Sequence, residues 1–479
     1  MSTRDIVQRL WGMCHTLRDD GVTYFQYVTE LTYLLFLKMA EETGEESSYG
    51  KGIPAGLRWR DLTAKDGTEQ FDFYKKMLVD LGAKGRGRVR DIFANAQTSL
   101  RQPKNLKKLT TDIDALDWFS AKEEGLGDLY EGLLEKNATE VKSGAGQYFT
   151  PRPLIESIVS LVKPRPGERI QDPALGTGGF LICADAYIKT QFSGLADLDA
   201  KAQEFQSKKA FYGVELVPET HRLALMNALL HDIDGEWALG DTLSPSGSEL
   251  PLADVILTNP PFGTKKGGEQ PTRDDFTFPT SNKQLAFVQH IYRGLRAGDR
   301  AAVVVPDNVL FEDGQGVKIR QDLMEKCDLH TVLRLPTGIF YAQGVKTNVL
   351  FFNRGRTDKG HTQRVWIYDM RTNMPSFGKR TPLTHNHFKE FEAAFGADPL
   401  GKSKRKDQGE EGRFRCFDRE FIEKRNWNLD ITWLRDENVE HADDLPEPDV
   451  IAAEVMVHLR TALAEMEALT VALEGEATE

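Results

Sequence analysis

The sequence is poor in cysteine, and it lacks long apolar runs. Its four cysteines form no CxxC pair, which argues against a disulfide framework or a zinc site and fits a reducing cytoplasm. No stretch of about eighteen apolar residues occurs, so no membrane-spanning helix is expected. The first residues, MSTRDIVQRLWGMCH, lack the apolar core of a signal peptide, and we expect them to be mature sequence. The cysteines are Cys14, Cys183, Cys327 and Cys416.

The chain also lacks an excess of positive charge, with a formal net charge of -12. An acidic protein is a poor partner for nucleic acid if the charge is spread over its surface. From Asp436 to the end, however, 13 residues are acidic and one is basic, so the other 435 residues hold 60 of each sign. The body of the chain is therefore balanced and can still carry a local basic face for phosphates.

The length of 479 residues predicts two or three domains. Residues 1–140 read as mostly helical, and TYFQYVTELTYLLFLKMAEE is apolar all round, as in a buried helix. Two basic stretches, 81–93 and 101–108, read as loops that contact DNA backbone or are simply solvated. Short apolar segments then alternate with helical stretches up to residue 355, which is typical of an α/β parallel sheet. The seven candidate strands are 169–174, 209–216, 236–243, 254–259, 300–306, 330–336 and 347–352.

The connection between the last two candidate strands is too short for a helical crossover, so we expect that pair to be antiparallel. We therefore expect a helical domain over 1–140, an α/β domain over 141–355 and a mixed region over 356–447. An acidic helix over 448–479 should follow, because its apolar residues repeat at heptad spacing. That helix packs on its own protein or on a partner helix. Its seam is Ala452, Val455, Leu459, Ala462, Met466, Leu469 and Leu473.

Polar or glycine-rich segments close the first four strands in turn. DPALGTGGF (172–180) lets the backbone approach a ligand at the carboxyl end of the sheet. A dinucleotide fingerprint needs a third glycine where Leu181 stands, so a nicotinamide enzyme is disfavoured. Glu215 follows the second strand and could accept both hydroxyls of a ribose, or be an ordinary strand-end residue. Asp241 follows the third and could accept from an adenine amine, or cap a helix.

The fourth strand ends in NPPF (259–262), and GQYFTPR (146–152) precedes the first. The latter segment could close over a ligand or cap a helix. In this order the motifs resemble those of the S-adenosylmethionine-dependent DNA methyltransferases that methylate amino groups. More closely, with LPTGIFYAQGVKTNVLFF (335–352) and the helical N-terminal region, the chain resembles the modification subunits of type I restriction–modification systems. The implied fold is a Rossmann-like methyltransferase sheet with a final antiparallel strand, and the implied activity is N6-adenine methylation of DNA.

The resemblance also implies roles for single residues. Asn259, Pro260, Pro261 and Phe262 match the catalytic tetrapeptide, with Phe in place of the commoner Tyr. Phe262 stacks on the target base, and Phe340 or Tyr341 supplies a second aromatic. No metal is expected. The residues assigned to S-adenosylmethionine are Gln147, Tyr148, Phe149, Thr150, Pro151, Arg152, Asp172, Gly176, Thr177, Gly178, Gly179, Glu215 and Asp241.

An amide oxygen on Asn259 and the carbonyl oxygen of Pro260 suit this chemistry, because each can accept one hydrogen of an exocyclic amine. The loop after Phe262, with Lys265 and Lys266, clamps a phosphate backbone or is a plain surface loop. The family implies double-stranded DNA, a specificity subunit, a restriction subunit and a second copy of this chain as partners, in a prokaryotic cytoplasm. The alternatives are a protein-glutamine or RNA methyltransferase, and a cofactor-binding assembly subunit without turnover.

Overall fold

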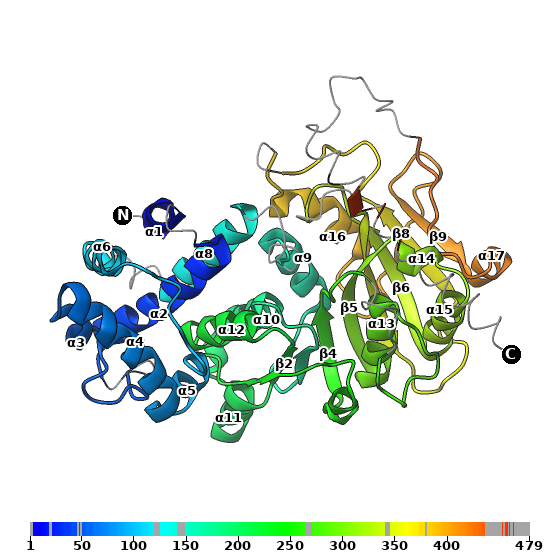
Figure 1. Ribbon diagram of the computed structural model, residues 1–479. Helices are drawn as coiled ribbons and strands as arrows, with labels where there is room; N and C mark the ends of the chain where they lie inside the picture. Colours follow the sequence, from blue (N-terminus) through cyan, green and yellow to red (C-terminus); the bar gives the residue numbers. More distant parts are fainter. Residues whose placement is uncertain are drawn as a thin grey trace, which may run out of the picture. The chain divides into compact units, whose positions relative to one another are not determined.

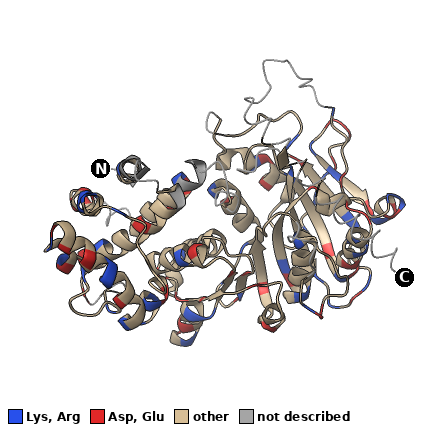
Figure 2. Cartoon of the chain, viewed as in Figure 1, with Lys and Arg blue, Asp and Glu red and all other residues tan. Residues whose placement is uncertain are grey.

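The computed structural model describes residues 3–18, 22–45, 47, 50–118, 125–140, 149–263, 271–340, 345–378 and 381–435, together with 453, 456, 457, 459 and 463. No helix among these residues is long and apolar enough to cross a membrane. Figure 2 shows basic and acidic residues interspersed along the described helices and strands, as a balanced body requires. By its contacts the chain forms two compact units. Unit 1 is Met1–Phe149, Leu175–Asp185 and Leu198–Gly240; unit 2 is Thr150–Ala174, Ala186–Asp197 and Asp241–Glu479.

Unit 1 is built on a buried helix, α2, which begins with a capping box at Thr23 and is buried on most sides, as its all-round apolar sequence predicted. Helix α12 packs against α2, α5 and α8. Its Arg222 donates to the backbone oxygens of Ile92 and Ala94, at 2.7 and 2.8 Å. The helices of this unit are α1 (Thr3–Arg18), α2 (Tyr24–Thr43), α3 (Trp59–Thr63), α4 (Gly67–Lys84), α5 (Arg88–Ile92), α6 (Pro103–Asp114), α8 (Leu126–Glu140), α11 (Ala200–Lys208) and α12 (Pro218–Leu230).

The two basic stretches predicted as loops are largely helical, so that prediction was wrong. Residues 81–93 contain the end of α4 and the whole of α5, while 101–108 contain the start of α6. Arg88 is not solvated freely, because it donates to the backbone oxygen of Gly235 at 2.7 Å. Buried Val89 and Ile92 alternate with these charges and hold α5 in place. The sequence analysis predicted a loop because the many basic residues outweighed the two apolar residues that α5 buries.

Unit 1 also holds two short parallel strands, β2 (Phe211–Glu215) and β3 (Glu236–Leu239). They pair with Tyr212 opposite Glu236 and with Glu215 opposite Leu239. Both strands therefore end at the same edge. Helix α10 (Gly179–Gln191) follows the glycine-rich turn.

Unit 2 contains a mixed sheet whose hydrogen-bonded strands follow the order β1-β4-β5-β7-β6-β8-β9 (Figure 1). Strands β1, β4 and β5 are parallel, and β7 is antiparallel to both β5 and β6. The expected antiparallel pair is thus confirmed, as are all seven candidate strands. The strands of this unit are β1 (Ile170–Asp172), β4 (Ala253–Thr258), β5 (Leu295–Pro306), β6 (Cys327–Arg334), β7 (Thr347–Arg354), β8 (Arg364–Asp369) and β9 (Phe414–Asp418).

Helices cover both faces of this sheet, because successive strand residues point to opposite sides. In β7, Leu350 and Phe352 belong to the large apolar core formed with α13 and α15. Phe351 points the other way and packs on Phe391 and Phe395 of α16. The helices of this unit are α9 (Arg152–Val162), α13 (Lys283–Gly294), α14 (Asn308–Phe311), α15 (Gln315–Lys326), α16 (Lys389–Phe395) and α17 (Arg419–Lys424), with short 3₁₀ helices η2 (Ser193–Leu195), η3 (Pro245–Glu249) and η5 (His385–Phe388).

The sheet continues past residue 355, where the sequence indicated only a mixed region. Strand β8 runs parallel to β6, and β9 closes the sheet antiparallel to β8. The antiparallel β7 is therefore not the last strand, and 356–447 extends the sheet. The boundaries near 140, 355 and 447 remain predictions from sequence pattern. Most of the heptad helix over 448–479 lies outside the described residues.

Candidate functional site

The end of β4 lies beside the end of β1 at one edge of the unit 2 sheet. The strands are parallel, with Gln171 opposite Ile256. Asp172 and Asn259 therefore both follow at the carboxyl edge, where open α/β sheets bind their ligands. Asp172 is 1% exposed, and its Oδ1 accepts from the backbone N–H of Ala174 at 3.0 Å, which shapes the turn.

The side-chain amide of Asn259 is held by one hydrogen bond. Its Nδ2 donates to the Oγ1 of Thr150 at 3.0 Å. Its Oδ1 is buried and has no hydrogen-bond partner among the described residues. A buried acceptor without a partner costs about 1–3 kcal/mol and calls for an explanation. The bond to Thr150 thus leaves the acceptor end of the amide unused.

The rest of the tetrapeptide is held from α13. The Nε2 of Gln284, a buried residue in the first turn of α13, donates to the backbone oxygen of Pro261 at 3.1 Å. Asn282 caps the same helix by accepting from the backbone N–H groups of Gln284 and Leu285. Sequence analysis missed Gln284, because no motif marks a glutamine 23 residues downstream of the proline that it contacts.

The ring of Phe262 meets the ring of Phe340, with centroids 6.1 Å apart and planes at 76°. This edge-to-face arrangement is a favourable one for aromatic pairs. Phe340 is 4% exposed, whereas Phe262 is half-buried. The structure brings these two expected aromatics together. Tyr341 lies outside the described residues.

In unit 1, the glycine-rich turn closes on Glu215. The carboxylate of Glu215 accepts from the backbone N–H of Gly176 at 2.9 Å and from that of Val217 at 2.8 Å. Burial raises the pKa of Glu215, and its hydrogen bonds from backbone N–H groups oppose that shift. Each of its oxygens accepts one of these two bonds, and the backbone N–H of Leu216 also bonds to the carboxylate. A carboxylate has about four acceptor positions, so acceptor capacity is left for a ligand hydroxyl.

This turn is held by Asn227, which the sequence analysis missed, and it requires the predicted Gly178. Asn227 of α12 donates to the backbone oxygen of Thr177 at 3.0 Å. Gly178 has a φ of +86°, and a Cβ there would lie 2.4 Å from the ring of Trp237. A side chain at 178 is therefore excluded by both conformation and space.

Among the remaining residues assigned to a cofactor, Asp241 and Arg152 have partners within the protein. Asp241 accepts from the backbone N–H of Leu243 at 2.8 Å, and the next helix, η3, is preceded by Ser244, so Asp241 shapes a turn and is not a helix cap. Pro151 precedes the first residue of α9. Arg152 begins α9 and pairs with Glu156 at 3.2 Å. Phe149 is half-buried. The assigned residues Gln147 and Tyr148, and also Lys265 and Lys266, lie outside the described residues.

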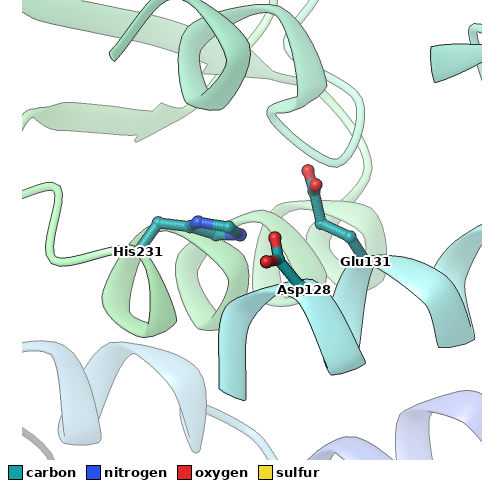
Figure 3. Close-up of side chains that lie close together, drawn as sticks. All are labelled: Asp128, Glu131 and His231. Atoms are coloured by element: carbon teal, nitrogen blue, oxygen red, sulfur yellow. The ribbon is translucent and has the colours of Figure 1, made fainter. Parts of the chain in front are cut away.

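Two further polar groupings lie away from these motifs. In unit 1, Figure 3 shows Asp128, Glu131 and His231 converging, with one possible ligand atom from each within 4.8 Å of the others. Carboxylates and imidazole are common ligand types, yet exposed groups of this kind also form without a metal. In unit 2, a cleft of about 360 Å³ includes Arg273 and His290 in its lining but none of the residues assigned to cofactor or base.

Comparison with known proteins identifies the family. The sequence matches the N-6 DNA Methylase family over residues 121–442 and the HsdM N-terminal domain family over residues 6–113. It is 53% identical to the type I restriction enzyme StySPI methylase subunit of Salmonella potsdam, and 52% identical to the EcoKI methylase subunit of Escherichia coli K12. Each alignment covers 98% of this chain and 95% of the relative.

Solved structures agree with this relationship. The crystal structure of the EcoKI M protein is 49% identical, with a TM-score of 0.58 and coverage of 98% of this chain and 96% of that one. A type I restriction–modification structure, solved in a study of complex assembly and conformational transition, reaches a TM-score of 0.72 at 27% identity, covering 99% of both chains. The chain therefore belongs to the N-6 DNA methylase family and is an adenine-specific DNA methyltransferase of the type I restriction enzyme kind.

Proposed function

We propose that this chain transfers the methyl group of S-adenosylmethionine to the N6 amine of adenine, with Asn259 and Pro260 as the two acceptors for the amine hydrogens. The unpaired, buried Oδ1 of Asn259 is the observation that carries the proposal. Because Nδ2 is engaged by Thr150, the amide presents its oxygen, and not its N–H groups, to a ligand. An amine hydrogen would satisfy this acceptor.

Two acceptors change the reactivity of an aromatic amine. The lone pair of the adenine N6 is delocalised into the ring, which makes it a poor nucleophile. Hydrogen bonds from both N–H groups to fixed oxygens draw the nitrogen toward a tetrahedral shape and localise the lone pair. S-adenosylmethionine, when bound, would supply the methyl group: the N–C bond to N6 would form as the C–S bond of the sulfonium breaks, and the proton released from N6 would pass to solvent. Placement and electrostatics of this kind lower barriers by several kcal/mol.

The base must leave the duplex before its amine can reach these oxygens. A face of Phe262 would stack on it, with Phe340 supporting the Phe262 ring through their edge-to-face contact. Since the Oδ1 of Asn259 is buried, entry of the base requires a local shift of side chains around it. Such a shift would let the adenine amine donate a hydrogen bond to Oδ1, which has no other partner among the described residues.

For the cofactor, S-adenosylmethionine supplies an activated methyl group on a positively charged sulfur. Glu215 would accept the ribose hydroxyls, and the turn through Gly176 and Gly178 would let the backbone approach the ligand. The donor set fits such a group, because the Glu215 carboxylate keeps acceptor capacity and Gly178 tolerates no side chain. Asp172 and Asp241 complete the proposed cofactor residues, with Asp241 facing the adenine amine of the cofactor.

Replacing Asn259 by Ala tests the proposal. We expect methyl transfer to DNA to fall by at least about a hundredfold, the usual effect of removing one preorganised polar group, while cofactor affinity is retained. Asn353→Ala is the matched control, because Asn353 is also buried, donates through Nδ2 to a single partner and leaves its Oδ1 unpaired. It lies at the opposite end of the sheet, on β7. A near-normal methylation rate in Asn259→Ala would refute the mechanism.

We further propose that DNA sequence is read by a separate specificity subunit that joins two copies of this chain and a restriction subunit. The acidic heptad segment 448–479 is the proposed docking element. Deleting it should leave cofactor binding intact and weaken copurification with the specificity subunit. Full copurification of the truncated chain would rule out this role for the segment.

A further inference from the structure

The proposal above gives no role to an ion pair in unit 2, between Asp307 and Arg371. Asp307 follows β5, and its carboxylate receives two hydrogen bonds from the guanidinium of Arg371, at 2.8 and 2.9 Å. The exposed fractions of the two side chains are 17% for Asp307 and 9% for Arg371. The amide of Asn348 donates to the same carboxylate at 2.7 Å. The pair is therefore nearly buried, and both partners are well bonded.

The same arginine holds both ends of the β6–β7 connection. Its Nε donates to the backbone oxygen of Leu335, the first residue after β6, at 3.0 Å. One Nη donates to the backbone oxygen of Thr347, the first residue of β7, at 2.8 Å. The backbone N–H of Asp307 also donates to the oxygen of Lys346, at 2.9 Å. The ion pair therefore holds the two described ends of the connection, at Leu335 and at Lys346–Thr347.

This connection carries Phe340. Between its fastened ends, the backbone oxygen of Thr337 accepts from the N–H of Phe377 at 3.1 Å. Gly338, with a φ of +78°, lies so close to Phe377 that a Cβ would be 2.1 Å from its backbone oxygen. The backbone next to Phe340 is therefore closely confined by Phe377, and this restricts where the Phe340 ring can contact the ring of Phe262.

We propose that Asp307 and Arg371 form a positioning pair for methyl transfer, which holds Phe340 in edge-to-face contact with Phe262 and so fixes the orientation of the Phe262 ring that stacks on the everted base. The inference rests on the proposed function of Phe262. Neither Asp307 nor Arg371 contacts the tetrapeptide in any hydrogen bond or ion pair found among the described residues, so they act through the connection. The guanidinium of Arg371 keeps the pKa of Asp307 below its usual range, which keeps the pair charged at neutral pH.

The segment that begins at Asp307 also reaches the tetrapeptide by a second path. Asn308 and Asn282 both donate to the carboxylate of Glu312, at 3.1 and 2.5 Å. Asn282 caps α13, and Gln284 in the first turn of α13 holds Pro261. The turn after β5 thus supports both the tetrapeptide and the Phe340 connection, so a disturbance of this turn moves the two rings relative to each other.

Arg371→Met tests the pair, in the complex reconstituted with the specificity subunit. Arg300→Met is a matched control, because Arg300, in the middle of β5, makes a comparable set of bonds: two to the carboxylate of Glu168 and two to backbone oxygens. The two arginines have nearly equal side-chain exposure, 7% and 9%. Both variants should lose thermal stability. A merely structural role predicts equal effects on catalysis per folded molecule.

We expect Arg371→Met to lower kcat at saturating DNA and cofactor by at least tenfold, with cofactor affinity by calorimetry within twofold of the original. The fluorescence change of 2-aminopurine at the target adenine, which reports eversion and stacking of the base, should also shrink. Arg300→Met should retain kcat and the fluorescence change. Asp307→Asn should follow Arg371→Met, which gives a second variant should the first not fold. Arg371→Lys should not restore kcat, because a lysine cannot bridge the carboxylate and Leu335 together.

Two results would overturn the inference: a kcat within twofold of the original in folded Arg371→Met and Asp307→Asn, or an equal loss of kcat in Arg300→Met. Asn259→Ala, assayed in parallel, separates this outcome from failure of the proposed function. If Asn259→Ala is inactive while Arg371→Met is fully active, the mechanism stands and the positioning role is wrong. If Asn259→Ala is active, the proposed function itself fails.

Discussion

The hydroxyl of Thr150 should control the direction in which the Asn259 amide points. Thr150 is 7% exposed, and its Oγ1 accepts the only hydrogen bond found for that amide among the described residues, at 3.0 Å. Thr150→Val keeps the shape of the side chain and removes the acceptor. A buried N–H left without a partner costs about 1–3 kcal/mol, and the amide can reduce that cost by rotating its oxygen away from the base. If this loss falls on the transition state, methyl transfer slows about 5- to 150-fold, since each 1.36 kcal/mol is a factor of ten.

The assay is single-turnover transfer of a tritiated methyl group to DNA by the complex with the specificity subunit, with cofactor affinity measured by calorimetry. Thr150→Ser is the control, because it retains the hydroxyl and loses only a methyl group. We expect Ser to stay near the original rate while Val slows transfer, with cofactor affinity similar in both. A Val variant as fast as the Ser variant would mean that the amide is oriented by something else. A loss of cofactor affinity in the Val variant alone would indicate that the Thr150 hydroxyl binds the cofactor, as the resemblance implied.

Two predictions concern titrating carboxyl groups. Burial raises the pKa of Glu215, so its carboxylate should be protonated, and cofactor affinity should fall, at a higher pH than for an ordinary glutamate. Glu215→Gln should weaken cofactor binding and remove this pH dependence. Calorimetry between pH 5 and 8 measures both effects. Burial and the neighbouring carboxylate of Asp254 raise the pKa of Asp299 to about 6. The folded state therefore holds the proton more tightly than the unfolded state, and stability falls as the pH rises from about 4 to 6. Asp299→Asn should raise the melting temperature at pH 8 and change it little near pH 4; an equal shift at both values would disprove the assignment.

The strands of the sheet could be predicted from the sequence because each is a short buried run between turn residues. In the described sheet of unit 2, the turn residues at the carboxyl edge of β1 and β4 were also predictable, since glycine and Asn-Pro mark where the backbone leaves a strand. The last two strands were not foreseen. Trp366 of β8 and Phe414 of β9 stack on each other at the margin of the sheet, and their segments are interrupted by charge.

The supporting contacts of the site could not be predicted, because they join residues far apart in the chain. Thr150 and Asn259 are separated by 109 positions, and Asp307 and Arg371 by 64. Thr150 and Asn259 each lie in a motif, but no spacing rule links the two motifs, and Asp307 and Arg371 lie in none of the motifs. The resemblance assigned Thr150 to the cofactor, and its visible partner is the proposed catalytic amide. Hydrogen bonds of this kind follow from the tertiary structure and are visible only in it.

The reversed direction of β7 has a consequence for how this enzyme can vary. Because β6 runs toward the reactive edge and β7 runs away from it, the segment joining them begins and ends at that edge. Residues inserted into the connection between β6 and β7 would lengthen it at that edge without changing the pairing of the strands in the sheet. This connection is therefore a place where the reach of the enzyme over its target can be adjusted while the framework that holds the amide and the ring stays the same.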